Sequence, residues 1–229
     1  MALYALADLH LALGSPKPMD IFGGRWVGYQ EKISQSLSAL RPEDTLVIPG
    51  DFCWAMDLEQ AVPDFAFLES FPGRKLLVKG NHDYWWNTAS KFTKFCQEHS
   101  FENLHLLHNN CYFYGDLALC GTRGWFYEED KGGTHDEKVF RRELLRLETS
   151  LKAAGEHEKI CFLHYPPCYR GYTCPEILEL LRRYKVGTCY YGHLHGDSHK
   201  LAIEGLFGAT RFCLVASDYV NFRMVPISI

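Results

Sequence analysis

Short apolar runs recur along the chain, and several of them end directly at a polar residue. Four of these runs cover residues 3–7, 45–48, 75–78 and 159–163. Runs of this length, bounded by glycine, proline or polar residues, are typical of buried β-strands. The segments with helical character between them cover residues 26–40, 57–70 and 84–98. Strand and helix therefore alternate, which favours an α/β fold with polar residues at its strand ends.

The second half of the chain continues with two helices and a group of short strands. Two apolar stripes at helical spacing are formed by Phe140, Leu144, Leu147 and Leu151 and by Ile177, Leu180 and Leu181. A Thr-x-x-Glu pattern begins at Thr134 before the first stripe and at Thr173 before the second, which predicts a capping box at each helix start. Short strands are expected near residues 186–191, 201–204, 212–216 and 224–229.

The composition fits one domain covering residues 1–229. Hydrophobic residues make up 47% of the chain and charged residues 23%, which is enough to bury a substantial core. The formal net charge of −4 and the pI near 6.2 give no broad basic surface of the kind that nonspecific nucleic-acid binders show. Nucleic acid is therefore a disfavoured partner, whereas the sequence leaves the oligomeric state open.

Cysteine usage and the N-terminus indicate the compartment. The nine cysteines are odd in number, scattered and never arranged as Cys-x-x-Cys, which favours reduced thiols over disulfides or a thiolate metal site. The N-terminal residues lack the cationic stretch of a signal peptide. No apolar run approaches the ~20 residues that a membrane span requires. We expect a cytoplasmic protein with no membrane partner.

The polar residues at the ends of the runs are of the types that bind hard metal ions. Five fragments carry them: Asp8-Leu9-His10, Gly50-Asp51, Gly80-Asn81-His82-Asp83, His164 and Gly192-His193-Leu194-His195. Asp, Asn and His without Cys suit Mn, Fe, Co or Zn at a hydrolytic centre. Residues two apart on an extended strand end point to one side, so each D-x-H or H-x-H pair can share an ion. Two such ions are a recurrent device for attacking phosphate esters.

Taken together, the fragments resemble the signature of the calcineurin-like metallophosphoesterases: D-x-H, G-D, G-N-H-[DE], H and G-H-x-H, in that order. Every element is present from residue 8 to residue 195. The resemblance implies a four-layer α/β/β/α sandwich of two mixed sheets flanked by helices, with two divalent metal ions at one end. It assigns one ion to Asp8, His10, Asp51 and His195. It assigns the other ion to Asp51, Asn81, His164 and His193.

The same resemblance implies a mechanism. A hydroxide bridging the two ions attacks phosphorus, because metal binding lowers the pKa of water. His82, which is adjacent to the ligand Asn81 and is not a ligand in the family, is the expected general acid for the leaving oxygen. Asp83 either orients His82 or caps the turn, and we favour the structural role. Mn is the expected metal, with Fe, Zn or Co as alternatives, and the substrate is a small phosphodiester or phosphomonoester, which includes nucleotide-derived esters.

At some motif positions this chain carries other residues than particular branches of the superfamily do. The serine/threonine protein phosphatases continue the second motif as G-D-x-x-D-R, whereas this chain reads Gly50-Asp51-Phe52-Cys53-Trp54-Ala55, which disfavours phosphoproteins as substrates. The opening segment resembles the UDP-diacylglucosamine hydrolases, although those typically carry Arg where His82 stands. The segments 80–86 and 121–125 are similar to a bacterial branch of phosphohydrolases with no substrate that we can name.

Several residues near the motifs have two interpretations. The aromatic residues Trp54, Tyr84, Trp85, Trp86 and Tyr165 either pack in the core or stack on a flat part of the substrate, and core packing is the favoured interpretation. Arg123, between two glycines, either clamps a phosphate through its planar fork or lies on the surface. Two other functions remain open: a catalytically inactive binding scaffold of the same fold, and a single-strand nuclease, which would need a local positive groove.

Overall fold

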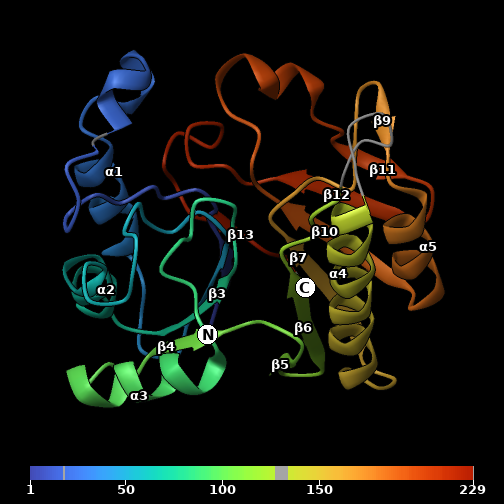
Figure 1. The fold of residues 1–229 in the computed structure, drawn as a ribbon, viewed down its shortest axis with the longest axis horizontal. Helices are drawn as coiled ribbons and strands as arrows, with labels where there is room; N and C mark the ends of the chain where they lie inside the picture. Colours follow the sequence, from blue (N-terminus) through green and yellow to red (C-terminus); the bar gives the residue numbers. More distant parts are fainter. Residues whose placement is uncertain (18, 127–133, 229) are drawn as a thin grey trace.

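The computed structural model describes residues 1–17, 19–126 and 134–228, with the side chains of Thr134 and His135 excluded. Two large sheets lie face to face (Figure 1). The first sheet has the order β13 (Val225–Pro226), β1 (Leu3–Ala5), β2 (Thr45–Pro49), β3 (Arg74–Val78), β4 (Leu104–Leu106). The second has the order β11 (Gly205–Phe207), β12 (Thr210–Leu214), β10 (Val186–Tyr191), β7 (Glu158–Leu163), β6 (Leu117–Thr122), β5 (Cys111–Tyr114). Both sheets are parallel except at the antiparallel strands β13, β11 and β5, so both are mixed.

Helices cover the outer face of each sheet. The helices α1 (Tyr29–Leu37), α2 (Val62–Glu69) and α3 (Ala89–His99) lie beside the first sheet, and α4 (Thr134–Ala153) and α5 (Pro175–Arg183) lie beside the second (Figure 1). Three short 3₁₀ helices, η1 (Met19–Phe22), η2 (Gly24–Trp26) and η4 (Gly196–Leu201), and a small hairpin of β8 (Cys168–Tyr169) and β9 (Tyr172–Thr173) complete the described elements. This arrangement confirms the predicted α/β/β/α sandwich.

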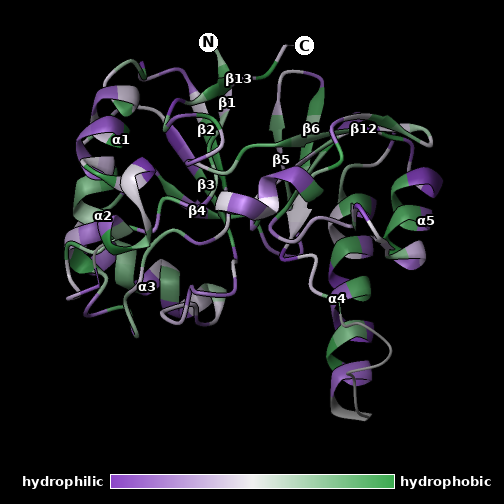
Figure 2. Ribbon diagram, turned by 90° about the horizontal axis from the view of Figure 1, so that it is seen from above, coloured by the Kyte–Doolittle hydropathy of each residue, from purple (hydrophilic) through white to green (hydrophobic). Residues whose placement is uncertain are grey.

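The strands alternate their side chains between two core layers. In β3, Leu76 and Val78 pack between the two sheets, whereas Leu77 packs against the helices of the first sheet. In β7, Ile160 and Phe162 belong to the layer between the sheets. Because both faces of these strands are buried, they form continuous apolar runs rather than alternating ones. Figure 2 accordingly shows mostly hydrophobic strands between helices that carry residues of both kinds.

The sequence predicted the early strands and all five helices, but the helices expected at 26–40, 57–70 and 84–98 are shorter in the structure. It missed β4, β5 and β6 and the hairpin of β8 and β9. The strand expected at 201–204 is wrong, because η4 runs to Leu201 and the strand follows at Gly205–Phe207. The capping box at Thr173 is also wrong: the helix begins at Pro175, whose fixed φ suits the first helical position, and Cys174 is the N-cap without a side-chain hydrogen bond. The other capping box, at Thr134, lies outside the described side chains.

Two further expectations concern the thiols and the membrane. The nine cysteines all lie in the described part of the chain and are free, as the sequence predicted. Among the residues that the structure describes, no helix combines the length and the apolar character needed to cross a membrane.

Candidate metal centre

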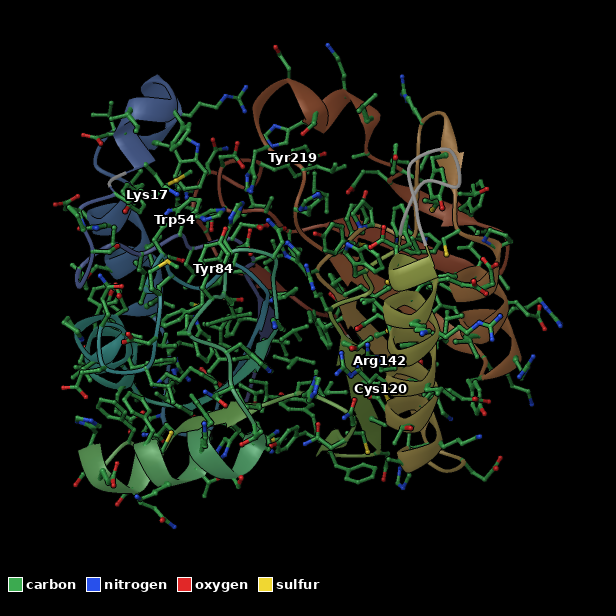
Figure 3. The ribbon with its side chains drawn as sticks, in the orientation of Figure 1. Lys17, Trp54, Tyr84, Cys120, Arg142 and Tyr219 are labelled. Atoms are coloured by element: carbon green, nitrogen blue, oxygen red, sulfur yellow. The ribbon has the colours of Figure 1, made fainter. Side chains whose placement is uncertain are left out.

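The predicted ligands follow the carboxyl ends of parallel strands in both sheets. Asp8 and His10 come after β1, Asp51 after β2, Asn81 after β3, His164 after β7, and His193 and His195 after β10. These strand ends meet at one edge of the sandwich, where ligands bind in open α/β sheets. In Figure 3 the labelled Tyr219 lies near the middle of the molecule, whereas Trp54 and Tyr84 lie in the half that contains the first sheet.

The structure brings all seven side chains into one cluster. Oδ2 of Asp51 lies 3.6 Å from Nε2 of His10 and 3.6 Å from Nε2 of His164. A second carboxylate, that of Asp8, lies 3.4 Å from Nε2 of His195 through Oδ1. The amide oxygen of Asn81 lies 2.7 Å from Nε2 of His164 and 2.9 Å from Nδ1 of His193. Ligand atoms of Asp8, His10 and His195, and of Asp8, Asp51 and His164, lie within 4.8 Å of one another. The Asp51 carboxylate thus stands between two groups of donors.

Four of these residues have a left-handed backbone. The φ angles are 60° at Asp8, 45° at His10, 51° at Asp51 and 72° at His193. This conformation costs roughly 1–2 kcal/mol for each non-glycine residue. Neighbouring segments hold it in place: the N–H of Asp8 donates to the carbonyl of Gly50 (2.9 Å), and the N–H of His10 donates to the carbonyl of Asp51 (3.0 Å). Strained backbone of this kind is concentrated at functional sites.

The glycines of the motifs leave room for the ligands. A Cβ on Gly50 would lie 2.6 Å from Cγ of His164, and one on Gly80 would lie 2.8 Å from Cγ of Asp51. At Gly192 a Cβ would lie 2.8 Å from Cβ of Ala7. Each distance is too short for any side chain. The G-D, G-N-H and G-H-x-H patterns therefore need glycine because a ligand residue or its neighbour passes directly beside the backbone.

Asp83 joins two of the ligand loops. Its carboxylate is buried and accepts hydrogen bonds from the backbone N–H groups of Asp51 (2.9 Å), Phe52 (2.9 Å) and Gly80 (2.7 Å), and from Nε1 of Trp85 (3.0 Å). These contacts fix the loop after β2 against the loop after β3. Asp83 therefore acts on the backbone of the ligand loops, which is the structural role favoured from the sequence.

The protonation states of the cluster suit a divalent cation. Burial raises the pKa of Asp8 and of Asp51. Burial also lowers the pKa of His10 and of His164, and it brings that of His193 to about 4. Nδ1 of His10 is buried with no hydrogen-bond partner among the described residues. Neutral imidazoles, as at His10, His164 and His193, beside buried carboxylates are the donors that a bound metal ion requires. The cluster therefore fits a divalent metal.

His82 lies at the edge of the cluster. Its backbone N–H donates to Oδ1 of Asp51 (2.8 Å), while its ring stands 5.7 Å from the ring of His10 and 4.4 Å from that of Trp54. Nδ1 of His82 lies 3.3 Å from the hydroxyl of Tyr84. Burial, together with the positive charge of Lys17, lowers the pKa of His82 to about 4. The ring is beside the ligands without being one of the clustered donors.

The aromatic residues near the motifs divide between the two interpretations. Trp85 is 2% exposed and packs on Phe52 and Phe65, which is core packing. Tyr84, by contrast, is 49% exposed. The ring of Tyr165 lies 4.3 Å from that of His193. Core packing explains Trp85, whereas the two tyrosines border the cluster.

Trp54 is both packed in the core and in contact with the cluster. It is buried, stacks on His10 at 4.9 Å, and carries Nζ of Lys17 3.7 Å from its ring centre. The indole therefore supports the predicted ligand His10 and holds the ammonium group of Lys17 beside the cluster. Sequence reasoning missed Lys17, and the only sequence signal is its position a few residues after the D-x-H motif.

Arg123 also borders the cluster rather than lying on a remote surface. Its carbonyl accepts hydrogen bonds from the N–H groups of His164 (3.2 Å) and Tyr165 (3.0 Å). The guanidinium is 5.5 Å from the ring centre of Tyr165, and Nε is buried with no hydrogen-bond partner among the described residues. The positive charge of Arg123 contributes to lowering the pKa of His193, after burial and the neighbouring histidines. The guanidinium therefore lies beside the centre, where Nη2 donates to the hydroxyl of Tyr165 at 3.5 Å.

Two more residues contact the cluster without a motif to mark them. The ring of Trp26, in η2, stands 5.8 Å from the rings of both His10 and His195. Asp218, after β12, accepts a hydrogen bond from Nδ1 of His195 at 2.9 Å. Burial alone would lower the pKa of His195, but the charges of Asp8 and Asp218 outweigh it and raise the pKa to about 10.

A two-sheet α/β sandwich with clustered Asp, Asn and His donors at its strand ends is typical of metal-dependent phosphoesterases. The sequence comparison agrees, since residues 1–197 match the calcineurin-like phosphoesterase family. The chain belongs to that family, whose members are phosphoesterases that normally bind divalent metals. No functionally curated protein matches the chain.

Solved structures share the fold at low sequence identity. The phosphopantetheinyl hydrolase PptH from Mycobacterium tuberculosis aligns with a TM-score of 0.64 at 15% identity, over 98% of this chain and 95% of that one. A protein of unknown function, AQ665 from Aquifex aeolicus, aligns with a TM-score of 0.54 at 15% identity, over 98% and 95% of the two chains. TT1561 of Thermus thermophilus aligns with a TM-score of 0.56 at 13% identity, over 99% and 97%. At these identities the likeness concerns the fold.

Proposed function

We propose that the protein hydrolyses a small phosphate ester at a centre of two divalent metal ions. Asp8, His10, Asp51 and His195 would hold one ion. Asp51, Asn81, His164 and His193 would hold the other. The observation that carries the proposal is the convergence of these side chains from five segments, with Asp51 Oδ2 at 3.6 Å from a histidine of each group. When bound, the ions would supply an activated water and neutralise charge on the phosphoryl group.

The residues around the ligands have distinct tasks in this proposal. His82 donates a proton to the leaving oxygen, and the negative charge of the bound phosphate favours its protonated ring, whose pKa is otherwise about 4. Arg123 binds a phosphoryl oxygen through its planar guanidinium, which lies 5.5 Å from the ring centre of Tyr165. Lys17, held over Trp54, adds positive charge on the side of His10 and His82. The positive charges of Arg123 and Lys17 suit an anionic substrate.

A substrate panel on reconstituted protein tests the proposal. Metal-free protein is loaded with Mn, Fe, Co or Zn and assayed on aryl and alkyl phosphomonoesters, phosphodiesters, cyclic nucleotides and nucleotide sugars. Phosphopantetheinyl esters join the panel because PptH, which shares the fold, is a phosphopantetheinyl hydrolase. We expect hydrolysis that depends on added metal, with Mn the most effective. Full metal occupancy without hydrolysis would instead support an inactive binding scaffold, and cleavage of single-stranded oligonucleotides alone would support a nuclease.

Two variants separate the roles within the centre. Asp51→Asn should lower the metal content, because a neutral amide cannot bridge two cations as a carboxylate does. His82→Ala should keep both ions and lose ~10²–10⁴-fold in kcat. The loss should be larger for alkyl esters than for aryl esters, since a good leaving group needs less protonation. The matched control is His157→Ala, which removes an exposed histidine just before β7. Unchanged turnover of alkyl esters in His82→Ala would refute the general-acid role.

A further inference from the structure

Asp218 is a buried carboxylate whose contacts all lie beside the metal centre. Oδ1 accepts hydrogen bonds from Nδ1 of His195 at 2.9 Å and from Nε2 of His199 at 3.2 Å. Oδ2 accepts the backbone N–H of Gly196 at 3.0 Å. The residue is 2% exposed. Both oxygens are therefore engaged by the segment 195–199, although Asp218 lies some twenty residues further along the chain.

Asp218 contacts one nitrogen of the His195 ring, and the other nitrogen of that ring faces the cluster. Nε2 of His195 lies 3.4 Å from Oδ1 of Asp8 and 3.3 Å from Nε2 of His10, so this nitrogen points into the cluster. The other nitrogen, Nδ1, points to Asp218. A carboxylate that accepts the Nδ1 proton leaves the lone pair on Nε2 for a metal and fixes the ring orientation.

The other histidines of the cluster are held differently. Nδ1 of His164 lies 3.1 Å from the carbonyl of Pro49, and Nδ1 of His10 has no partner among the described residues. Nδ1 of His193 faces the amide oxygen of Asn81. Nδ1 of His164 also lies 3.7 Å from Oδ1 of Asp8, which is itself a member of the cluster. In the described part of the chain, His195 is thus the cluster histidine whose Nδ1 meets a carboxylate from outside the cluster. An anionic partner makes the ring more basic than a carbonyl does, so its effect should fall on one ion rather than on both.

The backbone places Asp218 with little freedom. The N–H and the hydroxyl of Ser217 both donate to the carbonyl of Ala7, at 3.0 and 2.7 Å. Ala7 immediately precedes the ligand Asp8, and its own N–H donates to Val215 (2.8 Å). The segment 215–218 is therefore tied to the end of β1 in the other sheet. It also lies beyond residues 1–197, which match the family.

We propose that Asp218 is a positioning residue that orients His195 and raises its affinity for the metal ion held with Asp8 and His10. His199 supports this role, because its ring holds the same carboxylate oxygen and packs on Tyr219 at 5.1 Å. The inference rests on the proposed function, since it presumes a metal ion at His195. Partners of this kind typically change metal affinity by ~10–100-fold.

Manganese binding to Asp218→Asn tests the inference without any assay of activity. Asn keeps the size of the side chain, but it removes the charge and sets an amide donor against one of the N–H groups. Titration of metal-free protein with Mn²⁺, followed by calorimetry and chelator competition, should show two sites in the wild type. In the variant one site should weaken by ~10–100-fold and the other should stay unchanged. Electron paramagnetic resonance at two equivalents should then change from a coupled pair to an isolated Mn²⁺ signal.

Two controls make the result specific. Asp197→Asn removes the same charge from an exposed position two residues after His195 and should bind both ions normally. His195→Ala combined with Asp218→Asn should bind Mn²⁺ no more weakly than His195→Ala alone, because Asp218 acts through that ring. A thermal melt of each protein separates loss of folding from loss of metal.

Each remaining outcome decides the question. Two unchanged Mn²⁺ sites in folded Asp218→Asn overturn the positioning role and leave the proposed function intact. No Mn²⁺ binding by the wild type overturns the metal centre itself. A third Mn²⁺ per chain that is lost in His199→Ala would show that Asp218 is itself a ligand, which also overturns the inference, since the donors of His195, His199 and Asp218 lie within 4.8 Å of one another.

Discussion

Alanine at position 80 tests whether the centre depends on the close approach of Asp51 to the backbone. A Cβ on Gly80 would meet both the backbone nitrogen and Oδ1 of Asp51, and it would lie 2.8 Å from Cγ. Rotation of the Asp51 side chain cannot relieve the contact with the backbone nitrogen. That N–H is held by the carboxylate of Asp83, which also holds the N–H of Gly80. The added methyl group must therefore push the two ligand loops apart.

The size of the effect follows from the geometry. Carbon atoms in ordinary contact stand ~3.5–4.0 Å apart, so Asp51 must move by about 1 Å relative to Gly80. A misplacement of about 1 Å at a catalytic centre costs ~100-fold in rate. Overpacking of a rigid buried site also costs ~1–3 kcal/mol of folding free energy. Gly80→Ala should therefore fold with reduced stability, bind metal weakly and lose about two orders of magnitude in kcat/KM.

The assay compares two glycine variants. Gly187→Ala is the control: Gly187 lies in β10, and a Cβ there meets nothing within 4 Å. Urea unfolding, metal content by mass spectrometry and hydrolysis of an aryl phosphate are measured for both variants. We expect Gly187→Ala to match the wild type in metal content and rate. Wild-type metal content and turnover in Gly80→Ala would refute the reasoning that close packing positions Asp51.

Three further predictions concern residues around the centre and the core. Asp83→Asn should lower the free energy of unfolding by ~2–3 kcal/mol in urea titrations, because either amide orientation sets a donor against N–H groups of the ligand loops. Arg123→Lys should raise KM for phosphate esters by ~10-fold with little change in kcat, because an ammonium cannot replace the planar fork; an unchanged KM in Arg123→Ala as well would contradict phosphate binding. Burial lowers the pKa of Lys75, which donates to the carbonyl of Phe71, to about 8 from 10.5. Below pH 8 the Lys75 ammonium is charged in the folded protein, and its burial costs stability. Between pH 8 and 10.5 the folded protein loses this proton while the unfolded chain still holds it, so the cost disappears. The stability of the wild type relative to Lys75→Met should increase by up to about 3 kcal/mol over that range.

The sequence pattern was sufficient to predict the alternation of strands and helices and the position of the candidate ligands at strand ends, and the resemblance to the metallophosphoesterases added the two-sheet architecture. Each ligand follows a strand directly, so its place depends on short segments such as 45–51 or 159–164 that can be read locally. Once the strands are parallel, their carboxyl ends meet and the ligands come together. The strands β4 and β5 were missed because the segment 104–114 mixes polar and aromatic residues, and their pairing with β3 and β6 is a tertiary property. The strand β6, by contrast, is a buried apolar run of the kind that marked the other strands.

The residues that support the ligands were beyond reach for a different reason. Lys17 lies over the ring of Trp54, and the ring of Trp26 lies beside that of His10. Both contacts form only on folding, and nothing in the sequence spacing relates Lys17 or Trp26 to His10. Asp218 is an instructive exception. The expected strand at 212–216 is an apolar run that ends next to Ser217 and Asp218, which is the same pattern that marks Asp8, Asp51 and His164. If every polar residue at the end of an apolar run had been taken as a candidate, and not only those within motifs, Asp218 would have been among the candidates.

The strained backbone and the hydrogen bonds between the sheets have a common origin. Asp8 and His193 both have positive φ and come from different sheets, and the N–H of His193 donates to the carboxylate of Asp8, 3.0 Å from Oδ2. Each turn is thereby stabilised by a group that the opposite sheet supplies. The ligand geometry consequently depends on the association of the two sheets, and a change at either strand end should disturb both. For this reason the effects of Gly80→Ala on stability and on metal content should appear together rather than separately.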